Sequence, residues 1–279
     1  RERGGGDAPE EVVRLLRDEN EYTQASQKHL EPFREILYQE MMGHQKEADE
    51  TLLIPSAGGY GYFGKYFVGK SYQVHYRRRK LPEGGWGAEE LVLDENEIAI
   101  DPEDGSKRPY CTVSGPHHDP AHSMFAYGTD FAGSDNYTLH VLPFGFTTRA
   151  AAASSSDARV QSVAKIELEQ TDGSAHWSPS GDRMYYVELD SEFRAFKVKI
   201  HVLGADPTGE QDAVLYEEMD RKFSVSVCQS SCYRFLIVTT ASAETSEVYL
   251  LDLTSPAAGL RRVAPRIFGH SYGVDHRNG

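Results

Sequence analysis

The sequence predicts a mainly β protein with the repeats of a β-propeller, preceded by a two-helix N-terminal extension. Two observations support this fold class. Apolar residues recur at helical spacing from Pro9 to about Met42. Beyond Pro55, strands rich in Tyr, Phe and Val return on themselves across polar turns, with no convincing helices between them. We therefore place the helical extension at 1–55 and the propeller at 56–279.

Two helices are expected in the extension, at about 9–29 and 32–44. Asp7 together with Pro9 is a plausible start for the first helix, because proline suits the first helical turn. Pro32 lies between the two apolar stripes. Since proline cannot donate the internal helical hydrogen bond, it most simply opens the second helix.

Four hairpins are expected after the extension, at 59–79, 124–142, 184–203 and 234–253. Three aligned strand starts, Met124, Met184 and Phe235, lie 60 and 51 residues apart. A recurring four-stranded unit of about 40–50 residues is typical of a propeller blade. The longer interval contains RAAAASSSDAR at 149–159, a low-complexity insertion of the kind that surface loops tolerate.

A turn signal in the same place supports the repeat. Ser-Pro-Ser-Gly-Asp at 178–182 precedes the strand that begins near Met184. His-Asp-Pro-Ala-His at 118–122 stands at the same place before Met124. The two turns thus occupy the same position relative to the strand that follows, as expected for successive blades.

Composition excludes several classes of protein. No run of 18 or more apolar residues is present, so we expect no membrane span. With 43 acidic and 29 basic side chains the net charge is −14, which argues against nucleic-acid binding. Cys111, Cys228 and Cys232 are too few for a disulfide framework, and the first residues carry no readable signal peptide. We expect a soluble, cytoplasmic protein.

Seven segments, in register along nearly the whole chain, carry a resemblance to a known family: LLRDENEYTQA (15–25), HLEPFREILYQEMMG (29–43), GGYGYFGKYFVGKSYQVHYRRRK (58–80), GSDNYTLHVL (133–142), RAFKVKIHVLGAD (194–206), DAVLYEEMDRKFSVSV (212–227) and YGVDH (272–276). They resemble the N-terminal part of the prolyl oligopeptidase family of serine peptidases, most closely its oligopeptidase B branch. The chain departs from the family pattern at 43–49, at Ala195 in place of a favoured proline, and at 118–120 in place of a Ser-Pro-Asp turn.

The resemblance implies a seven-bladed propeller that caps an α/β-hydrolase domain, which carries the catalytic Ser, Asp and His. Seven blades need roughly 300 residues, whereas 224 follow Pro55. We therefore expect about three to four blades, an incomplete propeller at 56–279, no catalytic domain and truncation at both ends. The chain by itself is predicted to be inactive.

For the intact parent, the resemblance implies cleavage of short peptides after Arg or Lys. The propeller would gate the access of oligopeptides, and the N-terminal helices would pack against the hydrolase domain. Two alternatives stay open: a stand-alone propeller that binds partner proteins, and the same region of a Pro-specific prolyl oligopeptidase.

One segment matches the nucleophile elbow of α/β-hydrolases. Gly269-His270-Ser271-Tyr272-Gly273 fits G-x-S-x-G. An elbow needs a strand before it, a helix after it, and an acid and a His later in the chain. Only six residues follow Gly273. We therefore interpret the segment as a propeller strand and predict no catalytic residue in this chain.

The densest group of metal-ligand side chains is His117, His118, Asp119 and His122. Pro116 and Pro120 bracket it. Because it coincides with a blade turn and no further ligand set is apparent, we interpret it as a solvated turn and predict no metal.

The remaining motifs also have ordinary structural interpretations. Cys228 and Cys232 form C-x₃-C without a second pair and are expected to be ordinary thiols. The basic run 77–80 is interpreted as a solvated hairpin edge, and the glycines between 58 and 64 do not precede a phosphate-binding helix. The adjacent carboxylates at 217–218 have no catalytic role in the family match. No cofactor is predicted.

Overall fold

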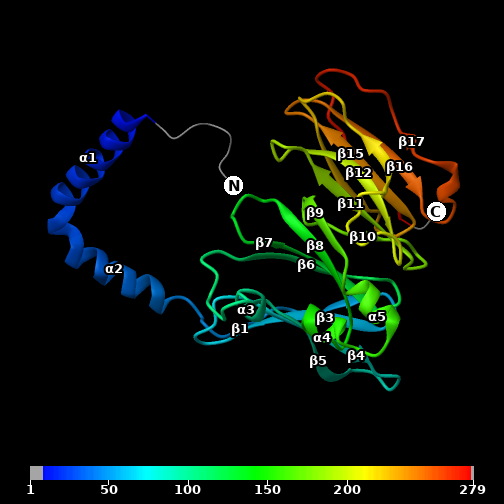
Figure 1. Cartoon of the computed structure of the whole chain (residues 1–279), viewed down its shortest axis with the longest axis horizontal. Coiled ribbons are helices and arrows are strands. Elements are labelled where there is room, and N and C mark those ends of the chain that lie inside the picture. Colours follow the sequence, from blue (N-terminus) through cyan, green and yellow to red (C-terminus); the bar gives the residue numbers. More distant parts are fainter. Residues whose placement is uncertain (1–8, 278–279) are drawn as a thin grey trace. The chain divides into compact units, whose positions relative to one another are not determined.

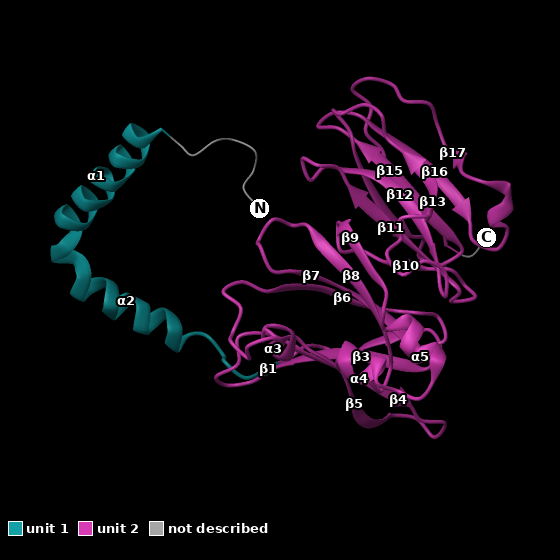
Figure 2. Cartoon of the chain, viewed as in Figure 1, with its two compact units in different colours: residues 1–49 teal, residues 50–279 magenta. Residues whose placement is uncertain are grey.

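The computed structural model describes residues 9–277, which fall into two compact units, 1–49 and 50–279 (Figure 2). Asp7, part of the expected start of the first helix, lies outside the described residues. Each unit is described by itself below.

The first unit contains two helices, α1 (Glu10–Gln27) and α2 (Glu31–Gly43), joined by the short 3₁₀ helix η1 (Lys28–Leu30). Pro9 occupies the cap position of α1, and Pro32 lies in the first turn of α2. Both expected helices are confirmed. Neither α1 nor α2 has a buried residue, so their apolar stripes remain exposed.

The strands of the second unit form three antiparallel sheets, which make up four successive blades (Figure 1). The first contains β1 (Asp49–Glu50), β2 (Ile54–Ser56), β3 (Tyr60–Tyr66), β4 (Val74–Lys80) and β5 (Trp86–Asp94). The second contains β6 (Thr112–His118), β7 (Met124–Asp130), β8 (Tyr137–Pro143) and β9 (Glu167–Thr171). The third contains β10 (His176–Trp177), β11 (Arg183–Leu189), β12 (Ala195–Val202) and β13 (Ala213–Glu217). The fourth contains β14 (Ser224–Gln229), β15 (Phe235–Ala241), β16 (Ser246–Asp252) and β17 (Arg261–Arg262). The middle sheet joins the second and third blades through the pairing of β9 with β11.

The four expected hairpins are the central strand pairs of these blades. Their registers join Tyr60 to Arg79, Met124 to Pro143, Arg183 to Val202, and Phe235 to Asp252. The sheets do not close into a ring, as a partial propeller requires. β2 includes residues 54 and 55, which the expected boundary at residue 55 places in the helical extension.

The expectation of no helices between the strands is wrong at three places. The insertion folds into α4 (Arg149–Ala153) and α5 (Ala158–Val163), and the short helix α3 (Glu95–Ile98) follows β5. Thr148 and Asp157 accept backbone hydrogen bonds at the starts of α4 and α5. Burial explains why this region is ordered: Ala152 of the insertion and Val163, which follows it in α5, lie in the interior.

Three of the four core clusters lie between successive blades, and the fourth packs Ile237, Val248 and Leu250 of the last blade against the segment that contains Tyr272 and Val274. Between the first and second blades, Leu93 packs with Phe125 and Leu142. Between the second and third, Met124 and Leu139 pack with Met184 and Tyr186. Between the third and fourth, Tyr185 and Val198 pack with Leu236 and Leu251. The adjacent residues Tyr185 and Tyr186 belong to different clusters because successive side chains of a strand point to opposite faces. The second and third blades therefore bury both faces against the blades on either side of them.

Among the described residues, no helix has both the length and the apolar character that crossing a bilayer demands.

Candidate functional site

The turn after the innermost strand has the same construction in the second, third and fourth blades. The backbone N–H of its first residue donates to the carbonyl five residues on: Asp119 to Met124, Ser178 to Arg183, and Ser230 to Phe235, each at 2.9 Å. A side-chain oxygen of the same residue accepts from that later N–H. The fourth residue has a positive φ: 53° at His122, 68° at Gly181 and 58° at Tyr233. The predicted repeat of this turn is confirmed.

These turns surround a cavity of about 300 Å³ to which all four blades contribute. It is lined by Ser56 and Ala57, by His118 and Pro120, by Trp177 and Pro179, and by Gln229, Cys232 and Tyr233, in blade order. These residues lie at or just after the ends of β2, β6, β10 and β14, the strands that precede the central hairpin of each blade. The cavity therefore lies where these strand ends of the four blades converge. We call it the inner-end cavity.

Hydrogen bonds connect the blades around this cavity. The hydroxyl of Ser56 lies 3.1 Å from Nε2 of His118. The indole N–H of Trp177 donates to the carbonyl of His117 at 2.9 Å, and the amide of Gln229 donates to the carbonyl of Trp177 at 3.0 Å. Side chains of the inner strands thus pair with the neighbouring blade.

The histidine-rich turn is not a solvated turn, so that expectation is wrong. Asp119 is 1% exposed and His122 is 5% exposed. The rings of His118 and His122 stack with centroids 4.4 Å apart, and Tyr62 stacks on His118 at 4.6 Å. The cluster is buried because the first and second blades pack on either side of it.

Its potential ligand atoms are directed to protein partners. Asp119 accepts from Ser123 and from the backbone of Met124, and Nδ1 of His122 lies 2.6 Å from the Tyr62 hydroxyl. Burial lowers the pKa of His118, and burial also lowers that of His117. The described part of the chain contains no group of three or more His, Cys, Asp or Glu that could hold a metal.

The basic run at 77–80 is only partly a solvated edge. Arg77 is buried, with its guanidinium 3.6 Å from the Phe144 ring centroid and 4.5 Å from that of Tyr60. It donates to Glu90 and to the carbonyl of His122, both at 2.8 Å. The alternation of strand β4 turns this one arginine toward the second blade.

Ser271 lies in an exposed segment with alternating burial, and no helix follows it within the described residues. The segment runs beside the start of β16: His270 accepts from the Ser246 N–H at 2.9 Å, and the Tyr272 N–H donates to the Ser246 hydroxyl at 2.8 Å. The imidazole of His276 lies against Cys232, with Nδ1 3.1 Å from Sγ.

The Cys232 thiol differs from the ordinary thiol expected from the sequence. Hydrogen bonds from Ser230, His276 and the Arg234 backbone lower its pKa to about 6. Burial and the nearby Asp275 raise the pKa of Cys228 instead. Sequence spacing could not reveal the pairing, because Cys232 and His276 are 44 residues apart.

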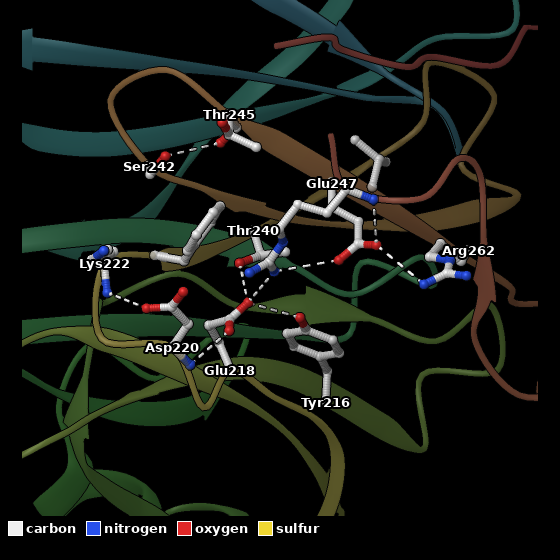
Figure 3. Close-up of polar contacts among 12 residues, drawn as sticks. Tyr216, Glu218, Asp220, Lys222, Thr240, Ser242, Thr245, Glu247 and Arg262 are labelled. Atoms are coloured by element: carbon white, nitrogen blue, oxygen red, sulfur yellow. Dashed lines mark hydrogen bonds and ion pairs between the residues drawn. The ribbon is translucent and has the colours of Figure 1, made fainter. Parts of the chain in front are cut away.

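A buried ion cluster lies in the third and fourth blades (Figure 3). Glu218 accepts from the Tyr216 hydroxyl at 3.0 Å and from Thr240 and Arg266 at 2.5 Å. Arg266 also lies 3.3 Å from Glu247 and stacks on the ring of Phe223. Burial opposes the ionisation of Glu218, but the bonds from Arg266 and Thr240 outweigh it and hold its pKa below the usual value. Glu217, its sequence neighbour, is exposed on β13.

The stacked antiparallel units, the repeated turn and the shared inner-end cavity define an open β-propeller. Residues 6–279 match the family described as "Prolyl oligopeptidase, N-terminal beta-propeller domain". The chain belongs to this family of serine peptidases.

Similar proteins agree with this assignment. Protease 2 of Moraxella lacunata is 26% identical over 269 residues, covering 95% of this chain and 36% of that protein. Dipeptidyl aminopeptidase BI of Pseudoxanthomonas mexicana is 27% identical over 279 residues, covering 95% and 35%. The chain thus spans about a third of the length of the curated relatives it matches.

Two solved structures share both the fold and appreciable identity. Oligopeptidase B from Leishmania major has a TM-score of 0.77 at 28% identity, covering 96% of this chain and 34% of that one. Oligopeptidase B from Trypanosoma brucei, with covalently bound antipain in a closed form, has a TM-score of 0.75 at 30% identity, covering 96% and 35%. The four blades are therefore similar to the N-terminal propeller of oligopeptidase B.

Proposed function

We propose that this chain is the propeller portion of an oligopeptidase B-like serine peptidase, in which it limits access to a hydrolase domain to short peptides. The observation that carries this proposal is the continuous series of four blades, whose inner ends converge on a small cavity filled at its edges by His118, Trp177 and Tyr233. A rigid wall of this kind would exclude folded proteins and admit narrow, extended chains.

The proposed parent cleaves after Arg or Lys and works in the cytoplasm. The net charge of −14 supports a preference for basic peptides, because an acidic surface attracts cationic substrates. Three free cysteines support a reducing compartment. Exposed apolar stripes on α1 and α2 support packing against a further domain.

The chain alone is proposed to be inactive. We expect no hydrolysis of a fluorogenic amide that carries Arg before the scissile bond, and an identical trace from Ser271→Ala. Hydrolysis that Ser271→Ala abolishes would show that a catalytic centre is present in this chain. Activity present equally in both proteins would identify a contaminant.

Gating is tested by a chimera in which residues 50–279 replace the matching blades of the Leishmania major enzyme. We expect the chimera to cleave a short Arg-containing peptide and to leave a folded protein with exposed Arg intact. Cleavage of the folded protein would contradict gating. The specificity of the parent is tested with the protein expressed from the full coding sequence. Its hydrolysis rates are compared on matched amide substrates that carry Arg, Lys or Pro before the scissile bond.

A further inference from the structure

A cysteine–histidine pair borders the inner-end cavity. Sγ of Cys232 lies 3.1 Å from Nδ1 of His276 and 3.4 Å from the Ser230 hydroxyl. The His276 ring meets the Phe235 ring edge-on, with centroids 4.8 Å apart, which holds the imidazole in place. A thiolate beside an imidazolium is the reactive form of cysteine.

The charged groups around the sulfur favour the thiolate. On the fourth-blade turn, Arg234 forms an ion pair with Asp252, with a guanidinium nitrogen 2.7 Å from a carboxylate oxygen. On the facing segment, Asp275 accepts from the Ser231 N–H at 2.9 Å and from its hydroxyl. From the second blade, His118 lines the same cavity. Asp252 is therefore paired with Arg234, Asp275 is held by Ser231, and the imidazole of His276 is the basic group that contacts the sulfur.

The thiol is also accessible. Cys232 is partly exposed and lines the inner-end cavity, whose volume of about 300 Å³ is at the lower end of small-molecule sites. Ala57, Pro120 and Pro179 line it from the other three blades. A small molecule can thus approach the sulfur from a side that no hydrogen-bond donor occupies.

We propose that Cys232 is a modification site that exchanges with low-molecular-weight disulfides entering the inner-end cavity. The Cys232 thiolate attacks one sulfur of the disulfide, forming a new S–S bond as the original one breaks. The departing thiolate takes the proton that His276 carries, leaving a neutral imidazole. The disulfide is the oxidant, and one equivalent of free thiol is released. This inference does not depend on the proposed peptidase function.

The test compares the three cysteines within one protein. The protein is incubated with 4,4′-dithiodipyridine or glutathione disulfide at pH values from 5.5 to 9. Peptide mass spectrometry then measures the rate of labelling at each cysteine. Cys228 is a more exposed residue than Cys232, but burial of its thiol raises the pKa, and Cys111 is buried. Against a thiol of ordinary pKa, the larger thiolate fraction of Cys232 outweighs its lower nucleophilicity, giving about fivefold faster reaction at pH 6.5 and about fifteenfold at pH 5.5.

His276 provides the variant. His276→Gln should move the midpoint of the Cys232 rate profile from near pH 6 toward the ordinary thiol value of about 8.5. The exposed His29→Gln is the matched control and should leave the profile unchanged. Faster labelling of Cys228 at pH 5.5, or a Cys232 midpoint that His276→Gln does not move, would overturn the proposal. The relative labelling of Cys228 and Cys232 is measured on the wild-type protein, so this outcome remains decisive even if the His276→Gln variant folds poorly.

Discussion

Arg266 shows how a single side chain stabilises buried charge in this protein. It bridges Glu218 and Glu247, each 4% exposed, while its own side chain is 26% exposed. Two carboxylates removed from water are costly unless a cation and hydrogen bonds compensate them. Phe223 supports the guanidinium through its ring face.

We expect Arg266→Met to destabilise the protein by about 2–4 kcal/mol, because it leaves Glu218 buried without a cation and Glu247 with only the longer contact to Arg262 at 3.5 Å. The partial exposure of Arg266 keeps the loss below that of a fully buried pair. Urea unfolding measures the change. Arg221→Met is the matched control, since Arg221 and Glu192 are both largely exposed, and it should leave the free energy of unfolding nearly unchanged. Equal effects of the two substitutions would contradict a role for burial.

The turn between the two innermost strands of a blade is the element that sets the repeat. Its fourth residue must adopt a positive φ, which glycine does readily and other residues do at a cost. Gly181 meets this demand in the third blade, whereas His122 and Tyr233 meet it in the second and fourth. In the second blade, the buried contacts of His122 with Tyr62 offset the backbone cost.

Gly181→Ala should therefore lower the free energy of unfolding by about 1–2 kcal/mol. A Cβ at Gly181 would also lie 3.3 Å from a carboxylate oxygen of Asp119. Gly87→Ala is the control, because Gly87 lies in β5 without a positive φ and its Cβ would meet only ordinary contacts. Thermal unfolding of both variants makes the comparison; a neutral Gly181→Ala would refute the backbone argument.

Over the whole molecule, buried histidines link stability to pH. Burial lowers the pKa of His117, His118, His140 and His176, to about 3 for His140 and about 4 for His176. Between these values and the unfolded value near 6.5, the unfolded chain binds more protons than the folded one. Stability is therefore fully present above pH 6.5 and is lost as the pH falls toward 3–4.

We expect the melting temperature to fall steadily from pH 7 to pH 4, with His140 and His176 each contributing roughly 3 kcal/mol of lost stability. His176→Gln should reduce the slope, because glutamine stays neutral. His44→Gln, at the exposed end of α2, should not. An unchanged melting temperature across this range would contradict the linkage.

The unclosed ring has a second consequence. Leu52 beside the first blade is 87% exposed, and Phe268 beyond the fourth is 85% exposed. Exposed apolar groups at open sheets favour association. We expect concentration-dependent self-association in sedimentation velocity, reduced in the double variant Leu52→Ser, Phe268→Ser. Val68→Ser, at a hairpin turn where the valine is 70% exposed, should leave association unchanged. A monodisperse monomer at all concentrations would refute this expectation.

Local pattern alone predicted much of this protein. The two helices, the four hairpins and the repeated turn follow from residue periodicity and turn chemistry, which act over a few neighbouring residues. The order of the insertion could not be predicted from the sequence, because α4 and α5 contact β8, and residue preferences do not reveal that contact.

Only the tertiary structure decided which residues meet across blades. Cys232 with His276, Glu218 with Arg266, and His118 with Tyr62 are separated by 44 or more residues. The last two pairs form because neighbouring blades stack, and the first forms because the segment after the fourth blade returns to the turn of that blade. The sequence by itself thus determined the repeating unit. The stacking of units determined the buried charges, the lowered histidine pKa values and the inner-end cavity, because burial and long-range contact exist only after the blades have packed.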